Sequence, residues 1–277
     1  MLNKMRNVLY GIHDQRQERS VLIYTEPKRR NRDLPLPTVE GSRRNSVKAA
    51  MEALDPMTVN EKAERNQQRI RRLLDGTGER CLFMCRPALI PLLEAPHGDV
   101  TLSNEPVSDW VPWVVENHRR EVESLERLGD NSVPLAKLST ATHIFAQAFG
   151  APVHVFDDSN PCALPLVQNA NEADRLEVPD LWSVRSLCRI FELGDLVRRE
   201  LGPDTDFGIC DMQTGFDIAN LIWNKEDLLC AMALDPEPVK RLSAKCAQLL
   251  KTFLIEIRKE FPTMSPCHCP GNWVPPH

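Results

Sequence analysis

Residues 206–223 read DFGICDMQTGFDIANLIW, and this stretch decides which class of fold the sequence predicts. Its first part, DFGICD (206–211), is short, largely apolar and ends on an acid, which is typical of a buried strand. A polar turn separates it from GFDIANLIW (215–223), which is predicted to be a helix. A strand that leads directly into a helix is the repeating unit of α/β proteins.

The same alternation extends on both sides of this stretch. Further strands are predicted in three segments: RCLFMC (80–85), VPLAKL (133–138) and TMSPCHC (263–269). Helices are predicted at 58–75, 107–128, 143–150, 181–201 and 238–260. Because a helix between two strands carries the chain back to the same end of the sheet, the strands should be parallel. The predicted fold is α/β, of the (β/α)8 TIM-barrel type, and a count of about four strands predicts only the first half of that barrel.

Folded structure is predicted to begin near Thr58, which can cap a helix with Glu61 as the other half of a capping box. A partial barrel domain is therefore expected over residues 55–277. Residues 1–48 carry 11 Lys/Arg against 5 Asp/Glu, so a basic segment precedes an acidic remainder. We interpret residues 1–50 as a disordered leader and predict no nucleic-acid partner, because no aromatic residues alternate with these charges to stack on bases.

Composition narrows the class of protein. The sequence is 42% hydrophobic and 26% charged, and no apolar run approaches the ~18 residues of a membrane span. Neither a membrane partner nor a secretory signal is therefore predicted, and the cytoplasm is the expected location. The nine cysteines are an odd number and are mostly dispersed, which favours reduced thiols over a disulfide framework.

Candidate site residues follow from the predicted strand ends, because side chains at the carboxyl ends of parallel strands line the ligand crevice. Asp211 and Asp217 are candidate catalytic carboxylates, able to serve acid–base chemistry or to hold a cationic substrate group. For Asp217 a local role in the first turn of its helix is the competing interpretation. For His143, which starts a predicted helix, a backbone contact competes with a ligand contact. The candidate substrate-binding residues are Arg86, Thr140, His143, Gln213 and Asn272.

A possible metal site lies near the end of the sequence. Cys267, His268 and Cys269 offer two thiolates and an imidazole, which are zinc ligands. In a strand, however, residues 267 and 269 point to one face and 268 to the other, so a further ligand from elsewhere would be needed. No phosphate-binding glycine loop and no G-x-S-x-G motif is present.

Two blocks carry a family resemblance: VPLAKLSTATHIFAQAFGAPVHVFDDSNPCALPLV, and DFGICDMQTGFDIANLIWNKEDLLCAMALDPEPVKRLSAKCAQLL. Their order resembles the uroporphyrinogen decarboxylase family, whose (β/α)8 barrels include tetrapyrrole decarboxylases and corrinoid methyltransferases. The resemblance implies a tetrapyrrole or corrinoid-linked substrate. A decarboxylase would need no cofactor, whereas a methyltransferase would use zinc and a corrinoid partner.

The sequence departs from both activities implied by this resemblance. The arginine-rich segment of the decarboxylases is replaced by CRPALIPLL, where only Arg86 could bind a substrate carboxylate, and their tyrosine aligns with Leu221. The methyltransferases resemble one another in a His-x-Cys pair and a later cysteine, an order that Cys267, His268 and Cys269 do not follow. A catalytically inactive fragment or binding module is therefore a further hypothesis, and the exposed strand edge of half a barrel would favour a homodimer.

Overall fold

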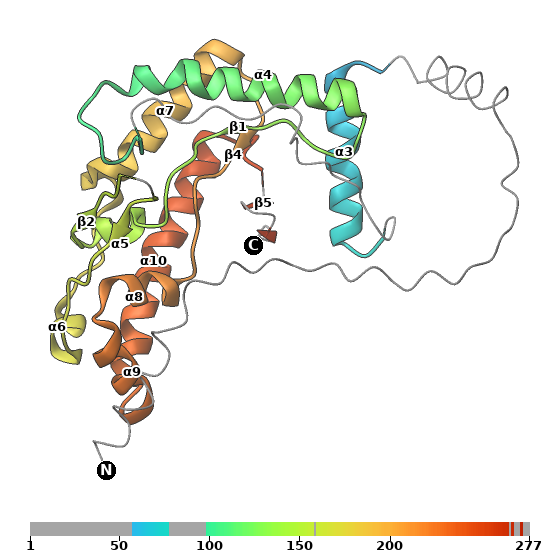
Figure 1. Cartoon of the computed structure of the whole chain (residues 1–277). Helices are drawn as coiled ribbons and strands as arrows, with labels where there is room; N and C mark the ends of the chain where they lie inside the picture. The colour runs from blue at the N-terminus through green and yellow to red at the C-terminus, as the bar shows by residue number, and fades with distance from the viewer. Residues whose placement is uncertain (1–56, 78–97, 158, 266, 269–271, 274–277) are drawn as a thin grey trace, which may run out of the picture. The chain divides into compact units, whose positions relative to one another are not determined.

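The stretch 206–223 forms a strand, a turn and a helix in the computed structural model, which describes residues 57–77, 98–157, 159–265, 267–268 and 272–273. Strand β4 (Phe207–Gly208) leads to helix α8 (Gly215–Ile222) (Figure 1). Strand β1 (Ala136–Lys137) lies beside β4, and the two are parallel, with Ala136 opposite Phe207. The parallel arrangement predicted for these segments is confirmed.

A third segment extends this parallel arrangement. Met264 forms an isolated parallel bridge with Phe207, and the Ser265 N–H donates to the Phe207 carbonyl at 2.8 Å. Strand β4 therefore has β1 on one side and Met264 on the other. The strands are much shorter than the predicted ranges 133–138 and 206–211. Only two residues of each form regular ladder pairs, with bonds to flanking groups such as Leu138 N–H to the Gly208 carbonyl at 3.0 Å.

Two further strand pairs are antiparallel. Strand β2 (Val153–His154) pairs with β3 (Cys162–Ala163), and β5 (Cys267–His268) pairs with β6 (Asn272–Trp273). The predicted strand 263–269 is therefore divided between the Met264 bridge and a separate antiparallel pair. The predicted strand 80–85 lies outside the described residues. Within the described part of the chain the three pairs do not close into a barrel, so half a barrel stays a prediction.

Most of the chain that the structure describes is helical. The remaining helical elements are α3 (Val59–Leu74), η2 (Val107–Trp110), α4 (Val111–Leu128), α5 (Ile144–Ala148), α6 (Ala170–Arg175), η3 (Leu181–Ser183), α7 (Arg185–Leu201), α9 (Lys225–Leu234) and α10 (Glu237–Glu260). The predicted helices are confirmed, although 3₁₀ turns replace the first residues of two of them. None of the helices described here combines the length and apolar character needed to cross a membrane.

Helix caps explain where several of these elements begin. Thr58 and Glu61 form the predicted capping box, with the Thr58 N–H donating to the Glu61 carboxylate at 2.7 Å. Helix α9 begins at the segment KEDLL, where no helix is predicted from the sequence. There Asn224 accepts bonds from the N–H groups of Glu226 and Asp227. Helix α9 buries only Leu228 and lacks one apolar face, so hydrophobic periodicity did not indicate it.

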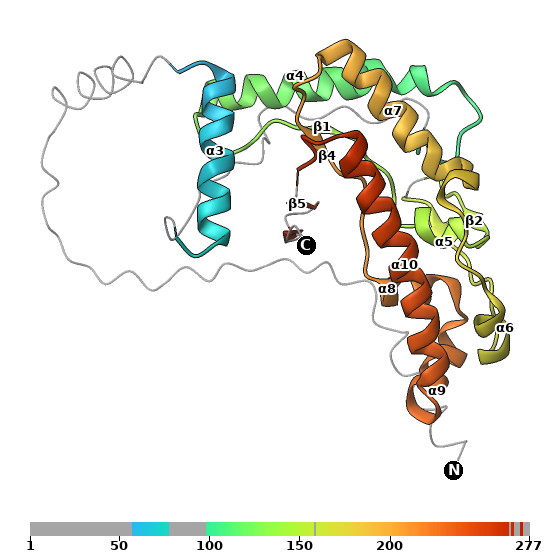
Figure 2. The same ribbon diagram turned by 180° about the vertical axis from the view of Figure 1, so that it is seen from behind.

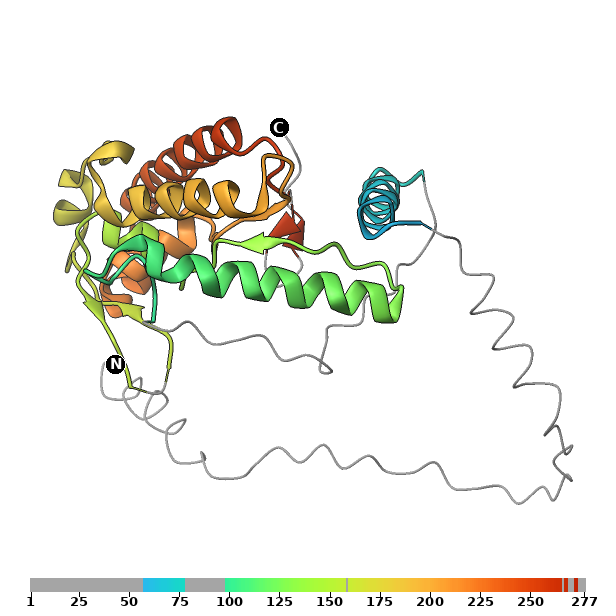
Figure 3. The same cartoon turned by 90° about the horizontal axis from the view of Figure 1, so that it is seen from above.

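The helices pack on one another and on β1. Helix α4 contacts β1 and α7, and α10 contacts α8 over much of its length. Seen from above, α4 runs along β1, with α7 and α10 beyond the strand (Figure 3). Helix α10 turns an apolar face to the core, where Leu242, Cys246 and Phe253 are buried. Phe253 meets Phe145 and Phe191 edge-on, at centroid distances of 5.3 and 5.6 Å.

The crossing of α8 and α10 depends on a glycine. The two helices lie side by side (Figure 2). A Cβ atom at Gly215 would lie 2.4 Å from the Ser243 carbonyl oxygen and 2.9 Å from Ala247 N. Both neighbours are backbone atoms of α10, so the helix could not yield without moving as a whole. Gly215 is therefore required for this close approach rather than for a left-handed turn.

We expect Gly215→Ala to destabilise the fold by about 3 kcal/mol, because the added methyl group would force two helices apart. The control is Gly76→Ala, where no atom lies within 4 Å of the new Cβ and only the positive φ of 68° is unfavourable. That control should cost about 1 kcal/mol. Urea unfolding of both variants measures the difference, and equal losses would contradict the packing argument.

Candidate strand-end site

The carboxyl ends of β1 and β4 bring two predicted site residues together. Thr140 follows β1 and Asp211 follows β4, and the Asp211 N–H donates to the Thr140 hydroxyl oxygen at 3.2 Å. Beyond the last strand pair, the Thr140 side chain thus takes the place of a backbone carbonyl as hydrogen-bond acceptor. Both residues are partly exposed. Thr140 and Asp211 are therefore neighbours, and their roles in a binding site stay predictions.

Asp99 is a residue of this site that the sequence did not indicate. One of its carboxylate oxygens accepts from the Ala141 N–H at 2.7 Å, in the turn after β1. The other accepts from both the N–H and the hydroxyl of Thr101, at 2.8 and 2.6 Å. The pattern Asp-x-Thr in GDVT was a local signal for such a turn. The sequence could not show that the turn lies against residue 141.

His143 lies behind these residues and is fully buried. Its Nε2 is 3.1 Å from the Thr101 hydroxyl oxygen. Its Nδ1 is buried and has no hydrogen-bond partner. Burial lowers the pKa of His143, and the negative charge of Asp99 acts in the opposite direction. The predicted helix start is confirmed, since His143 is the residue before α5, but its ring is enclosed rather than presented to solvent.

Burial and nearby negative charges both affect the pKa of the Cys210 thiol. It is completely buried, and burial raises its pKa far above the ordinary value. The negative charges of Asp211 and Asp99 raise the pKa further. Burial also raises the pKa of Cys246, to about 12. Both cysteines therefore stay protonated near neutral pH and are neither nucleophiles nor thiolate ligands.

The other predicted site residues have different positions. Asp217 forms a capping box with Thr214, whose N–H and hydroxyl donate to the Asp217 carboxylate at 3.1 and 2.8 Å. This is the local role that competed with catalysis. Gln213 has a buried Oε1 without a partner. Cys267 and His268 lie in β5 and Asn272 lies in β6, while Arg86 and Cys269 lie outside the described residues.

A metal centre is not assembled in the part of the chain that the structure describes. Among those residues, no three His, Cys, Asp or Glu side chains are grouped as metal ligands. The zinc site of Cys267, His268 and Cys269 stays a prediction. The same holds for the catalytic roles of Asp211 and Asp217.

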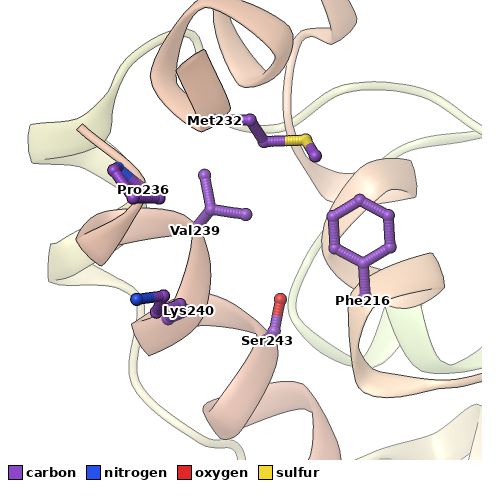
Figure 4. Close-up of a pocket in the computed structure, with 6 residues that line it drawn as sticks. All are labelled: Phe216, Met232, Pro236, Val239, Lys240 and Ser243. Carbon is purple, nitrogen blue, oxygen red and sulfur yellow. The ribbon is translucent and has the colours of Figure 1, made fainter. Parts of the chain in front are cut away.

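Two hollows lie near the site. One is an apolar groove at the start of α8 and α10, lined by Phe216, Met232, Pro236, Val239, Lys240 and Ser243 (Figure 4). The other lies between α4 and β1, where the Lys137 ammonium forms an ion pair with Glu121 at 2.5 Å. The first offers little polar chemistry, and the charges of the second pair with each other. Neither hollow contains Asp99, Asp211 or His143.

Comparisons with known proteins give a distant likeness to a solved structure. No family model matches the chain, and the search of curated proteins found no match. Among solved structures, the chain is similar to a methyltransferase from Methanosarcina mazei, with 14% identity and a TM-score of 0.47. The match covers 70% of this chain and 56% of the other, so the chain spans about half the length of that protein. Membership of the uroporphyrinogen decarboxylase family stays a prediction.

The segment that carries Asp99 is held by Arg189 of α7. This guanidinium is 7% exposed and donates to the Val100 carbonyl at 2.6 Å and to the Glu105 carbonyl at 2.7 Å. It also lies over the ring of Trp110, 5.8 Å from its centroid. Because the two carbonyls belong to one segment, Arg189 fixes that segment against α7.

We expect Arg189→Met to destabilise the protein by about 1–3 kcal/mol, because two carbonyls near Asp99 would lose their donor. The matched control is Arg185→Met, which removes one exposed bond to Asn104 from the same helix and should cost less than about 0.5 kcal/mol. Chemical unfolding of the two variants measures this. Similar losses would show that Arg189 does not anchor the segment.

Two histidines, one buried and one partly buried, should make the fold sensitive to acid. Burial lowers the pKa of both His143 and His118 from 6.5. The unfolded chain therefore binds these protons at a higher pH than the folded protein, so stability falls as the pH drops through about 6.5. We expect a lower urea midpoint at about pH 5.5 than at about pH 7.5. His118→Asn should reduce that difference, whereas the change His154→Asn at an exposed position should leave it intact.

Proposed function

We propose that the carboxyl ends of β1 and β4 bind a small molecule through its N–H or cationic groups, with Asp211 as the group that contacts it. The observation that carries this proposal is the position of Asp211. It follows a strand with parallel neighbours, and Thr140 after the adjacent strand accepts its main-chain N–H at 3.2 Å. In parallel α/β sheets, ligands bind outside the carboxyl ends of the strands.

The position of Asp211 beside a second carboxylate supports it as the contacting group. Asp99 already accepts three bonds from Thr101 and Ala141. Its oxygens are therefore largely committed within the protein. Asp211 is partly exposed, and it is joined to Asp99 through the Thr140–Ala141 turn, which bonds to both residues. Two nearby negative charges favour a ligand that brings hydrogen-bond donors or positive charge.

A tetrapyrrole or corrinoid-linked substrate fits this requirement and agrees with the sequence resemblance. The pyrrole N–H groups of a porphyrinogen are donors that a carboxylate can accept. In decarboxylation the bond between an acetate side-chain carbon and its carboxyl carbon breaks, carbon dioxide leaves, and a proton takes its place on the carbon. Under this proposal the Asp211 carboxylate accepts hydrogen bonds from the pyrrole N–H groups and stabilises the positive charge that develops on the ring.

Methyl transfer is a second candidate, favoured by the direction of the chain at Met264. The bridge between Met264 and Phe207 is parallel, so the chain runs through Met264 in the same direction as β4. The segment with Cys267 and His268, which comes next, is therefore expected to continue toward the end that carries Asp211. The donor set of Cys267, His268 and Cys269 fits zinc chemistry. Bound zinc would supply a Lewis acid that keeps a thiol substrate as its thiolate.

Binding is tested with coproporphyrin I, a stable porphyrin, by quenching of tryptophan fluorescence. We expect Asp211→Asn to weaken binding about tenfold, because one charge-assisted hydrogen bond is lost. The matched control is Asp204→Asn, an exposed carboxylate that precedes β4, at the opposite end of the strand. That variant should bind like the wild type. Absence of saturable binding by the wild type, or equal effects of the two substitutions, would contradict the proposal.

Decarboxylation and methyl transfer are distinguished by two assays. Carbon dioxide release from a uroporphyrinogen would support decarboxylation. Stoichiometric zinc in the purified protein, together with methyl transfer from methylcobalamin to a thiol and no carbon dioxide release, would support methyl transfer instead. Porphyrin binding with neither reaction would favour a binding module.

A further inference from the structure

Asp99, Thr101 and His143 form a chain of hydrogen bonds behind the strand ends. The Thr101 hydroxyl oxygen is 2.6 Å from an Asp99 carboxylate oxygen and 3.1 Å from His143 Nε2. Thr101 is 5% exposed and His143 is 0% exposed, so water does not compete for these contacts. The chain links residues more than forty positions apart in the sequence.

The donors and acceptors of this chain can be assigned from its chemistry. An ionised carboxylate only accepts, so Thr101 must give its single hydroxyl hydrogen to Asp99. The Thr101 oxygen is then left to accept, and the hydrogen of its second contact must belong to His143 Nε2. In a neutral imidazole this leaves Nδ1 without a hydrogen, as a lone-pair acceptor. Burial, which lowers the pKa of His143, favours the neutral ring.

The same carboxylate also reaches the residue next to Thr140. The second oxygen of Asp99 accepts from the Ala141 N–H at 2.7 Å. Thr140, one residue earlier, accepts the N–H of Asp211. Asp99 therefore holds the turn that in turn holds Asp211. A partly exposed carboxylate that accepts several hydrogen bonds fixes the groups around it, because leaving their donors unpaired is costly where these donors are buried.

We propose that Asp99 is a positioning residue of the strand-end site: one oxygen fixes the Thr140–Ala141 turn and hence Asp211, and the other fixes His143, through Thr101, as the Nε2–H tautomer. This inference extends the proposed function, because it names the residue that prepares Asp211 for a ligand. It does not require a particular ligand, since both effects exist in the free protein.

The tautomer is tested by nitrogen-15 NMR of the imidazole rings, with the signals of His143 assigned through the His143→Asn variant. In the wild type Nδ1 should give the signal of an unprotonated nitrogen and Nε2 that of a protonated one. Thr101→Val removes the hydroxyl and should shift both signals toward the average of the two tautomers. Thr252→Val, which removes an exposed bond to the Gln248 carbonyl in α10, is the matched control. The opposite tautomer, or unchanged signals in Thr101→Val, would overturn the assignment.

The effect on Asp211 is tested by amide hydrogen exchange. In Asp99→Asn one oxygen becomes an NH₂ group, so the side chain can no longer accept from both Thr101 and Ala141. We expect about tenfold faster exchange at the Ala141 and Asp211 amides, and no change in the middle of α10. Equal acceleration everywhere would mean that Asp99 only stabilises the fold, and no acceleration at Asp211 would mean that it does not position this residue.

A double-mutant cycle connects the inference to ligand binding. If Asp99 acts through Asp211, Asp99→Asn should weaken coproporphyrin I binding in the wild type but have little further effect in the Asp211→Asn variant. Independent losses would overturn the positioning role. If the wild type does not bind coproporphyrin I, the proposed function fails, and the NMR and exchange results still decide the role of Asp99.

Discussion

The parallel pairing of β4 with its two neighbours is the constraint on which the rest of this structure depends. Phe207 is buried between Ala136 on one side and Met264 on the other. Because the strands run in the same direction, the segments that follow them emerge at one end of the sheet. Two residues of regular ladder are enough to set this direction, since helices rather than further strand pairs cover the buried side chains.

Beyond the last ladder pair, side chains take over the hydrogen bonding of the backbone. Thr140 accepts the N–H of Asp211, Asp99 accepts the N–H of Ala141, and Arg189 donates to the carbonyls of Val100 and Glu105. Each bond joins segments that are distant in sequence. A buried polar group without a partner costs more than a typical bond contributes. These long-range contacts therefore select one arrangement of the loops at the strand ends.

Charge and burial together decide which groups near the strand ends can react. Cys210 lies in the same region as Asp99 and Asp211, yet burial and the two negative charges keep its thiol protonated. Asp217 uses its carboxylate to cap α8 and is exposed on the helix. Asp211 differs from both, because it is partly accessible and its main chain is fixed by the neighbouring strand end. The sequence positions of Cys210, Asp211 and Asp217 alone did not show which of them could contact a ligand.

The sequence by itself determined the helices, the capping box of Thr58 and Glu61, the parallel strand ends and the proximity of Thr140 to Asp211. The helices and the capping box depend on periodicity and on contacts within a few residues, which a single sequence displays. The parallel strand ends, and with them the neighbouring positions of Thr140 and Asp211, follow from the alternation of strands with helices. Only the tertiary structure decided the shortness of the strands, helix α9, the burial of His143 and the contact of Asp99 with Ala141. Those depend on which distant segments become neighbours. Packing and long-range hydrogen bonds fix that choice, and no local pattern in the sequence encodes it.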